Sequence, residues 1–339
     1  MNFSSDKCVV IAEAGVNHNG SLDIARRLAD HALASGADYV KYQTFVPSLV
    51  ASNTAPVAAY QSRAGYDTQE SMLSRFVLSD SDHRALKEHC DDIGIGFAST
   101  GHDLDSAGFL EELGQDFVKV GSGDLTNWQL LEVVASYGRP VLVSTGASEW
   151  EEVASTVNFL ENVGLSVQDD LVLLQCTSAY PAPVAEANVR VATRYREVFG
   201  CRVGYSDHTL SGEASLAAVA LGACVIEKHL TLDTSMEGPD HSASLDPSGF
   251  REYVSSLRRL GEALGQDDKT VTPSERGNQP LIRKGLYART EIAAGEPFSR
   301  ENVIAKRPVS PVAASSWPDI NGRLATRDYV TDEPLEGDQ

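Results

Sequence analysis

The hydrophobic and polar positions of this chain repeat one pattern seven times: an amphipathic helical stretch ends at a glycine, and a short apolar or β-branched run follows. The glycines are Gly36, Gly94, Gly114, Gly138, Gly164, Gly200 and Gly222. Each suits the left-handed conformation that closes a helix, because a residue without Cβ adopts it at little steric cost. With an opening apolar run, the pattern predicts strands at residues 8–12, 37–45, 95–100, 116–120, 140–144, 171–177, 201–206 and 223–228. Alternating strands and helices of this number and length predict a closed (β/α)8 barrel of the TIM type, and an open doubly wound sheet is the alternative.

Two regions interrupt the repeat and define the domain organisation. Residues 46–80 form a long insertion after the second strand, interpreted either as a lid or partner contact or as an ordinary surface excursion. Residues 266–280 are polar and broken by proline and glycine, a composition typical of a linker. We therefore predict a catalytic barrel at residues 1–265 and a small domain at residues 281–339. So short a domain has a small core and is expected to dock on the barrel or on a second subunit.

The chain of 339 residues is strongly acidic, with a net charge of −20 and a hydrophobic content of 42%. The hydrophobic content suffices for a full-size core. The charge argues against nucleic acid and anionic membranes as partners, since no basic run offsets it, and an anionic substrate would need a local basic pocket. Without an N-terminal signal segment or a long apolar stretch, the protein is expected in the cytoplasm. The five cysteines lack Cys-x-x-Cys spacing and are interpreted as packing residues, including Cys176 near the predicted rim.

Two histidines, His208 and His229, stand where apolar strand runs end, 229 − 208 = 21 residues apart. That separation is about one strand-plus-helix unit, so the imidazoles are expected side by side at the catalytic rim of the barrel, where a divalent metal could bridge them. Either histidine alone is more often a structural residue. Matching polar groups at the other strand ends favour the metal site.

Two lysines, Lys41 and Lys119, lie within apolar strands, and a buried charge requires an anionic partner. One interpretation is structural pairing with Glu13, Asp124 or Glu227. Strand-end serines and two glycine-rich turns favour instead a site for a small phosphorylated acid, because ammonium groups neutralise the anion while hydroxyls and turn N–H groups direct its oxygens. The histidine pair would add a Lewis acid.

These residues fall within segments that resemble the sialic acid synthases, which condense phosphoenolpyruvate with an N-acetylated aldose. The segments are IAEAGVNHNG (11–20), VKYQT (40–44), KVGSG (119–123), STG (144–146), CTSAYP (176–181), GYSDHT (204–209) and EKH (227–229). The C-terminal region is similar to that family's antifreeze-like domain, also called the SAF domain, in IAAGE (292–296) and KRP (306–308). The resemblance covers nearly the whole chain and implies a TIM barrel followed by an SAF domain.

The resemblance implies a role for each matching residue. For phosphoenolpyruvate it implies Lys41, Lys119, Ser122, Ser144 and Ser206, and for Mn²⁺ or Mg²⁺ it implies His208 and His229. For the open-chain sugar or the metal's water shell it implies Glu13, Gln43, Thr100, Tyr180 and Asp240. The predicted catalytic residues are Glu13, Lys41, Lys119, Asp124 and Glu227, with Glu227 or Asp124 managing the protons. A domain-swapped homodimer is also implied, in which Arg307 of the SAF domain reaches the sugar in the neighbouring subunit.

The implied reaction is attack of the enolpyruvate C3 on a metal-polarised aldehyde, followed by water addition at C2 and loss of phosphate. Several positions depart from the family's common pattern: Asp124 stands where glutamate is usual, residues 101–103 replace a Pro-Phe pair, Gln175 replaces histidine, and Ser178 sits where asparagine is frequent. The departures cluster on the sugar side. The resemblance implies an acceptor like N-acetylmannosamine, and the departures leave legionaminate, pseudaminate or other 3-deoxy-2-ulosonate precursors as alternatives.

Two rival functions use other features of the chain. A metal-free Schiff-base aldolase would use Lys41, Lys119 or Lys228 on pyruvate, but it leaves the histidine pair without a role. A non-catalytic carbohydrate- or ice-binding protein would depend on the antifreeze-like domain. An inactive descendant should have lost lysines or histidines, and this chain retains them, which favours the synthase.

Overall fold

The computed structural model describes residues 8–56 and 68–337. The chain divides into two compact units, Met1–Gly265 and Gln266–Gln339, and each is described by itself.

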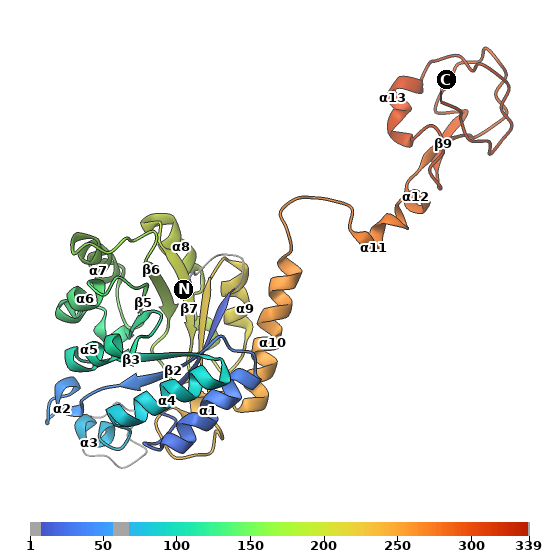
Figure 1. The fold of residues 1–339 in the computed structure, drawn as a ribbon. Coiled ribbons are helices and arrows are strands. Elements are labelled where there is room, and N and C mark those ends of the chain that lie inside the picture. Colours follow the sequence, from blue (N-terminus) through green and yellow to red (C-terminus); the bar gives the residue numbers. More distant parts are fainter. Residues whose placement is uncertain (1–7, 57–67, 338–339) are drawn as a thin grey trace. The chain divides into compact units, whose positions relative to one another are not determined.

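Eight parallel strands close into a barrel in chain order in the first unit (Figure 1). They are β1 (Val9–Gly15), β2 (Tyr39–Thr44), β3 (Gly96–Gly101), β4 (Val118–Val120), β5 (Val141–Ser144), β6 (Leu171–Cys176), β7 (Arg202–Asp207) and β8 (Val225–His229). The ladder is closed by β8, which pairs with β1. This arrangement confirms the predicted (β/α)8 barrel and excludes the open sheet.

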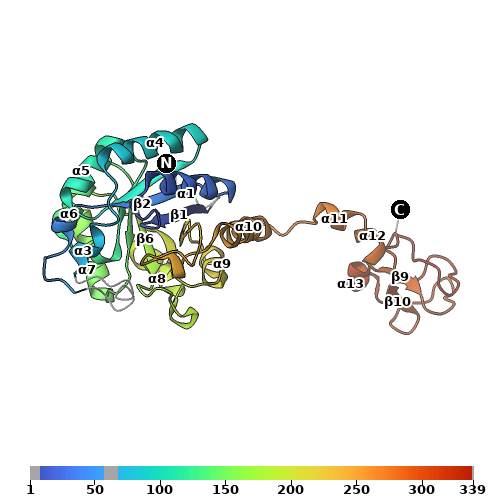
Figure 2. The same cartoon turned by 90° about the horizontal axis from the view of Figure 1, so that it is seen from below.

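Helices surround the barrel and follow one another round it in chain order (Figure 2). They are α1 (Leu22–Ala34), α4 (Asp80–Ile93), α5 (Leu104–Leu113), α6 (Trp128–Ala135), α7 (Trp150–Asn162), α8 (Arg190–Phe199), α9 (Glu213–Ala220) and α10 (Pro247–Leu264). The seven glycines at the predicted helix ends all have positive φ, which is why the chain can turn there into the next strand. At the other end of α1, Ser21 caps the helix, because its side chain accepts a hydrogen bond from the Ile24 N–H.

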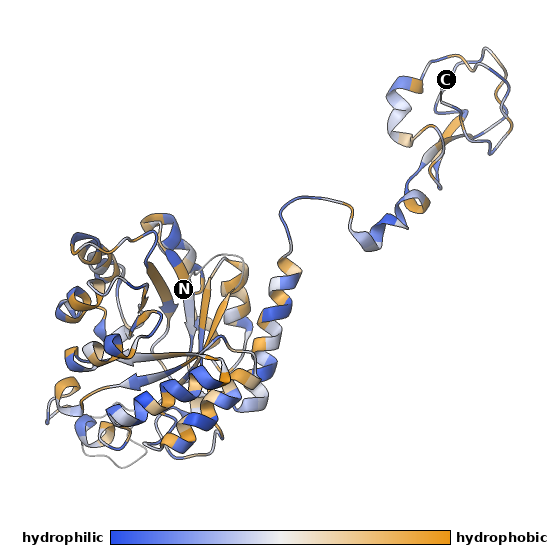
Figure 3. Cartoon of the chain, viewed as in Figure 1, coloured by the Kyte–Doolittle hydropathy of each residue, from blue (hydrophilic) through white to orange (hydrophobic). Residues whose placement is uncertain are grey.

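Side chains along each strand alternate between the barrel interior and the helix layer, as the two-residue period of a strand requires. In β8, Val225 packs in the interior cluster and Glu227 and His229 line the cavity above it. Ile226 and Lys228 face the other way, Ile226 in the cluster under the helices and Lys228 with its Nζ 5.5 Å from the Tyr253 ring. The helices show the matching pattern of hydrophobic and hydrophilic stretches (Figure 3).

The barrel interior has an apolar lower layer and a polar upper layer. The lower layer contains Val9, Ile11, Tyr39, Ala98, Phe117, Leu142, Val172, Leu174, Cys224 and Val225. Two residues further along several of these strands, the same inward-facing column becomes polar, as in Ile11 to Glu13 and Phe117 to Lys119. The register places Glu13 opposite Lys41 on one side and opposite His229 on the other. The functional groups therefore gather at the C-terminal ends of the strands, where barrel enzymes place their active sites.

The insertion after β2 contains two short helices, α2 (Pro47–Val50) and α3 (Gln69–Leu73). Met72 and Phe76 pack with Val16 and Phe45 in a small apolar cluster over the end of β1 and β2. This part of the predicted insertion is thus joined to the rim of the barrel. Residues 57–67 of the insertion lie outside the described residues.

The second unit contains α11 (Pro273–Arg276), α12 (Gln279–Ile282), β9 (Gly285–Ala288), β10 (Val303–Lys306) and α13 (Trp317–Ile320). Strands β9 and β10 pair antiparallel. Nine buried apolar residues form its core, namely Leu286, Ala288, Ile292, Phe298, Val303, Val312, Ala325, Tyr329 and Leu335. Helix α11 shows that the predicted linker region carries some regular structure. None of the described helices combines the length and the apolar character needed to cross a membrane.

Candidate active site

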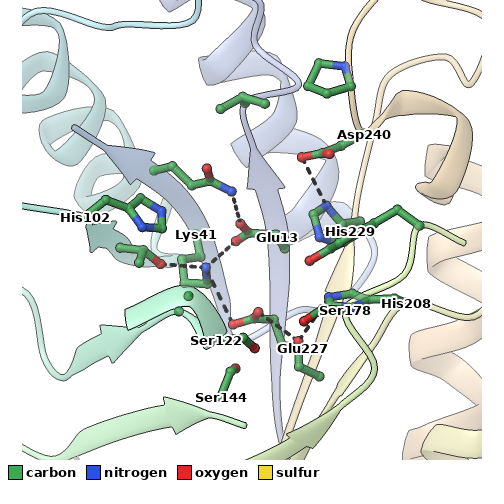
Figure 4. Close-up of a pocket in the computed structure, with 18 of the residues that line it drawn as sticks. Glu13, Lys41, His102, Ser122, Ser144, Ser178, His208, Glu227, His229 and Asp240 are labelled. Carbon is green, nitrogen blue, oxygen red and sulfur yellow. Dashed lines mark hydrogen bonds and ion pairs between the residues drawn. The ribbon is translucent and has the colours of Figure 1, made fainter. Parts of the chain in front are cut away.

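A cavity of about 330 Å³ opens at the C-terminal rim of the barrel. Most of the predicted site residues line it: Glu13, Lys41, Gln43, Thr100, Lys119, Ser122, Ser144, Tyr180, Ser206, His208, Glu227, His229 and Asp240. They come from all eight strand ends, or from the loops that follow them, and converge on one space (Figure 4). The tertiary fold thus brings together side chains that are more than 200 residues apart in the chain.

Lys41 lies in a buried network with two carboxylates. Its Nζ is 2.7 Å from Glu13 Oε2 and 3.6 Å from Glu227 Oε2, and it donates a hydrogen bond to Thr100 Oγ1 at 2.9 Å. Burial by itself lowers the pKa of the Lys41 ammonium, but the charges of Glu13 and Glu227 outweigh burial and raise it. Lys41 is therefore a permanent cation whose charge is balanced within the protein.

Lys119 is buried as deeply as Lys41, but nearby carboxylates balance less of its positive charge. Its Nζ donates to Ser144 Oγ at 2.8 Å and to the Val120 carbonyl at 3.2 Å, and the nearest carboxylate atom, Glu227 Oε1, is 3.9 Å away. Burial lowers the pKa of Lys119, and the opposing charge of Glu227 only partly offsets this effect. A desolvated ammonium with one distant carboxylate gains strongly from an anionic ligand.

Glu227 and Glu13 have opposite protonation tendencies. Burial raises the pKa of Glu227, but Lys119 and Lys41 outweigh burial and bring it to about 2. Burial raises the pKa of Glu13, and Lys41 does not fully reverse that effect. Glu227 also accepts a hydrogen bond from the Ser206 hydroxyl at 3.1 Å. Glu227 is therefore a fixed negative charge, whereas burial raises the pKa of Glu13 and, more clearly, that of Asp240.

Small donors surround the closed end of the cavity next to Lys119. The Gly146 N–H donates to Ser122 Oγ at 3.0 Å, and Ser122 Oγ lies 3.2 Å from the thiol of Cys176. A side chain at position 146 would overlap Ser178 and Cys176, so glycine is what lets this backbone approach the serines. Hydroxyls and a glycine turn beside a lysine are suited to a phosphate or carboxylate group.

The two histidines lie side by side, with ring centroids 5.5 Å apart. His208 donates from Nδ1 to the Thr177 carbonyl at 2.7 Å, so Nε2 carries the lone pair of the ring and lies 3.5 Å from Ser206 Oγ. His229 Nδ1 is buried, 4.0 Å from Asp240 Oδ2, and makes no hydrogen bond within the described part of the chain. Burial lowers the pKa of both histidines, so both rings are neutral near pH 7 and can offer a nitrogen lone pair to a metal ion.

An imidazole pair in which His208 presents its Nε2 lone pair and His229 has a buried Nδ1 without a described partner fits a metal ion that completes its coordination with water or substrate oxygens. The protein supplies few other ligands: across residues 8–56 and 68–337, no group of three or more His, Cys, Asp and Glu side chains is arranged to hold a metal. The Asp240 carboxyl group beside His229 has its pKa raised to about 7 by burial and by the charge of Glu13.

The remaining wall of the cavity is suited to a polar, uncharged ligand. Gln43 donates from Nε2 to Glu13 Oε1 at 3.2 Å. Tyr180 packs on His208, with ring centroids 4.2 Å apart, and meets His229 edge-on. Amide and aromatic groups of this kind offer hydrogen bonds and a flat apolar surface without adding charge.

Two residues that the sequence associated with the site lie elsewhere in the barrel, and a third belongs to the second unit. Asp124 is not on the cavity wall, because its Oδ2 faces His102 Nδ1 at 3.2 Å, and His102 is the residue that lines the cavity. Lys228 points to the helix layer and pairs with Asp207 at 3.3 Å. Arg307 belongs to the second unit, where it is exposed and donates to the Ile282 carbonyl at 3.0 Å. Its predicted contact with a sugar stays a prediction.

The cavity is also lined by residues for which no individual substrate or metal contact was predicted from the sequence. They are Val16, Met72, Leu73, Phe76, His102, Gly121, Gly123, Cys176, Ser178 and Pro239. The i, i+1, i+4 spacing of Met72, Leu73 and Phe76 was the available signal for the apolar wall, although α3 ends at Leu73. His102 directly follows a strand, as the predicted site residues do, and that position was its signal.

A (β/α)8 barrel with two buried lysines, two neutral imidazoles and a set of hydroxyls at its C-terminal rim is the architecture of a barrel enzyme for small anionic substrates. Comparisons with known proteins place the chain more narrowly. Residues 28–269 match the NeuB family and residues 283–339 match the SAF domain. The chain therefore belongs to the NeuB family, which confirms the resemblance to sialic acid synthases with a C-terminal SAF domain.

Several relatives of this chain are named as nonulosonic acid synthases. The N,N'-diacetyllegionaminic acid synthase of Campylobacter jejuni is 40% identical over 329 residues, which are 96% of this chain and 98% of that protein. The human N-acetylneuraminate-9-phosphate synthase is 35% identical over 301 residues, covering 88% of this chain and 83% of that protein. Among solved structures, the sialic acid synthetase of Leptospira borgpetersenii has a TM-score of 0.70 and 28% identity, covering 81% of this chain and 91% of that chain.

Proposed function

We propose that this protein condenses phosphoenolpyruvate with an N-acetylated aldose to give a 3-deoxy-2-ulosonic acid of the sialic-acid type and phosphate. The observation that carries the proposal is Lys119, a buried ammonium at the closed end of the cavity whose nearest carboxylate is 3.9 Å away. Ser144 and the Ser122–Gly146 contact lie beside it. Together these groups form a site in which a small phosphorylated acid supplies the missing negative charge.

The lysine wall and the uncharged wall of the cavity would each take one of the two substrates. Lys119, Lys41 and the hydroxyls of Ser122, Ser144 and Ser206 would hold the phosphate and carboxylate of phosphoenolpyruvate. Gln43, Thr100, Tyr180 and Asp240 would face the open-chain sugar. The fixed charge of Glu227 keeps both lysines protonated and oriented between the substrates.

His208 and His229 would hold the divalent metal ion, and the chemistry it would supply is polarisation of the sugar aldehyde. Mg²⁺ prefers oxygen ligands, whereas imidazole nitrogen suits transition metals, so Mn²⁺ is the better match to this donor pair. The tautomer of His208 is set by its bond to the Thr177 carbonyl, which directs Nε2 to the cavity.

In the proposed reaction the enolpyruvate C3 attacks the aldehyde carbon, water adds to C2, and the phosphate leaves. Glu13 is the group that we assign to proton transfer, because its pKa is raised by burial while Glu227 stays ionised. Asp124, which the sequence also suggested for this role, lies behind His102. The hydroxyls beside Lys119 would stabilise the departing phosphate.

The acceptor that we propose first is N-acetylmannosamine or a close analogue. The 40% identity to an N,N'-diacetyllegionaminic acid synthase over nearly the full chain favours a diacetamido hexose as a second candidate. We further propose a domain-swapped homodimer in which Arg307 completes the neighbouring site. A guanidinium offers a fixed fork of donors for the oxygens of such a sugar.

The test is release of inorganic phosphate from phosphoenolpyruvate with Mn²⁺ and a panel of N-acetylated hexoses and 2,4-diacetamido sugars. One acceptor should give phosphate together with an equal amount of a 2-keto-3-deoxy acid, and a chelator should stop the release. Release without a sugar, or no release with any, would refute the condensation. The Schiff-base alternative predicts a borohydride-trapped adduct with pyruvate, which the condensation does not form.

A further inference from the structure

We infer that His102 is a specificity-determining residue that binds the acceptor sugar, and that Asp124 acts through it as a positioning residue. The inference rests on the proposed function and adds a contact to it. It concerns a side chain that lines the cavity but belongs to neither the lysine network nor the histidine pair.

The backbone of His102 is held on both sides. Its N–H donates to the Thr44 carbonyl at 3.1 Å, which continues the ladder between β2 and β3 beyond the end of the strand. The next residue, Asp103, caps α5 by accepting a hydrogen bond from the Ser106 N–H at 2.9 Å. A Cβ on Gly101 would lie only 2.9 Å from the Ala107 nitrogen, so the strand enters the helix by a close approach. His102 therefore projects from a rigid segment, as a precise binding residue requires.

The imidazole of His102 contacts the carboxylate of Asp124, which is itself fixed by a hydrogen bond from Asn127. Its Nδ1 lies 3.2 Å from Asp124 Oδ2, and Asp124 Oδ1 accepts a hydrogen bond from Asn127 Nδ2 at 3.1 Å. Asp124 ends the short 3-10 turn Ser122–Asp124. The ring passes over Gly121, where a Cβ would be 3.3 Å from the ring carbon Cε1. Both carboxylate oxygens of Asp124 are thus engaged within the protein, which leaves the ring as the group that meets a ligand.

The bond to Asp124 determines what the ring can bind. When the ring carries a single proton, on the Nδ1 that faces the carboxylate, Nε2 carries a lone pair and accepts hydrogen bonds. Nε2 has no hydrogen-bond partner among the described residues. A lone pair repels the oxygens of a phosphate or carboxylate but accepts a hydrogen bond from a hydroxyl or an amide N–H. The complementary ligand is therefore the sugar and not phosphoenolpyruvate.

The position of His102 agrees with this assignment. It lies across Glu13 and Lys41 from His229 and Asp240, on the opposite side of the cavity (Figure 4). A sugar between these two walls would be held by Asp240 on one side and by His102 on the other. Changes in the acceptor's hydroxyl or acetamido pattern near His102 would then alter the number of hydrogen bonds made.

The experiment separates the two ring nitrogens by substitution. In His102→Asn the amide reaches the position of Nδ1 and keeps the contact with Asp124, whereas in His102→Gln it reaches the position of Nε2. Losing one hydrogen bond to a neutral group changes affinity by roughly two- to twelvefold. We expect His102→Asn to raise the KM for the acceptor by that factor, with the KM for phosphoenolpyruvate unchanged, and His102→Gln to restore part of the loss. The matched control is His89→Asn, which breaks a histidine–aspartate pair on the surface, where His89 Nε2 is 2.8 Å from Asp30 Oδ1.

The inference is overturned if His102→Asn leaves the acceptor KM unchanged, or if it raises the KM for phosphoenolpyruvate instead. Circular dichroism of each variant shows that the barrel is folded. If the wild-type protein releases no phosphate with any acceptor, the proposed function fails, and the inference is then tested by calorimetric titration with N-acetylmannosamine. Binding by wild type that is weakened in His102→Asn supports the contact without the reaction. Equal binding, or none, rejects it.

Discussion

Lys119 should determine the affinity for phosphoenolpyruvate, and Lys119→Met tests this directly. Methionine has nearly the same length, so the cavity keeps its shape while the charge is lost. Among the described residues, the ammonium of Lys119 makes hydrogen bonds to Ser144 and the Val120 carbonyl, and it would form charge-assisted bonds with the incoming anion. Truncating one partner of a desolvated charge pair costs about 2–5 kcal/mol. The KM for phosphoenolpyruvate should rise roughly 30-fold to several thousand-fold, at about 1.4 kcal/mol per factor of ten.

Two measurements check the predicted loss of affinity for phosphoenolpyruvate independently. The first is the KM for phosphoenolpyruvate from phosphate release at saturating acceptor and Mn²⁺. The second is thermal unfolding with phosphoenolpyruvate, because a ligand at 100 times its Kd stabilises the native state by about 2.7 kcal/mol. Lys119→Met should lose this stabilisation at the concentration that is sufficient for the wild type.

The matched control is Lys228→Met, a substitution of an equally buried lysine on the opposite face of its strand. Lys228 pairs with Asp207, and neither side chain is exposed. Removing one member of a buried ion pair costs about 3–5 kcal/mol of stability. Lys228→Met should therefore lower the free energy of unfolding but leave the KM for phosphoenolpyruvate within about twofold. A Lys119→Met protein whose KM changes by less than threefold, or a Lys228→Met protein that is folded but loses substrate affinity, would refute the placement of the anion.

Three further predictions concern other parts of the protein. His229→Ala should remove most of the Mn²⁺ bound to the wild-type protein, measured by equilibrium dialysis, and full turnover of a chelated, metal-free sample would contradict the assigned metal. Mixing inactive Arg307→Ala and Lys119→Ala proteins under subunit exchange should restore activity toward half the wild-type value per hybrid dimer; no recovery despite demonstrated exchange would rule out a swapped SAF domain. Burial and the nearby His83 and His241 lower the pKa of His18 to about 3, below its unfolded value near 6.5. Because the unfolded chain then binds the extra proton, stability should fall as the pH drops below 6.5, by about 2 kcal/mol at pH 5. Urea unfolding at pH 7.5 and pH 5 should show a smaller loss for His18→Gln, and an equal loss would exclude His18 as the cause.

The order of elements could be predicted from the sequence because short-range sterics determine it. Glycines such as Gly94 and Gly114 end helices wherever the chain needs a left-handed residue, and the structure places both in that conformation. Polar residues at the ends of apolar runs indicated the catalytic rim, because parallel strands in a barrel all end on the same side. The barrel and most of the cavity wall followed from these local signals.

The separation of Lys228 from Lys41 and Lys119 depends on the two faces of a strand. Lys228 stands between Glu227 and His229, so alternation alone sends it to the helices when its neighbours face the cavity. The pattern contained this information, but it becomes decisive only once the barrel has defined which face is the interior. The same holds for Ile226, which packs under the helices.

The contacts across the cavity depend on the closed barrel and could not be obtained from any local pattern. Asp124 was expected to meet the substrate, but His102, 22 residues earlier in the chain, occupies the wall in front of it. Met72 and Phe76 reach the site only because the insertion folds back onto Val16 and Phe45. The sequence alone determined which chemical groups stand at the strand ends, because the alternation of side chains along a strand and the ending of helices at glycines depend on neighbouring residues only. Which of those groups touch was decided by the tertiary structure, because closure of the barrel sets distances between residues that the chain itself leaves far apart.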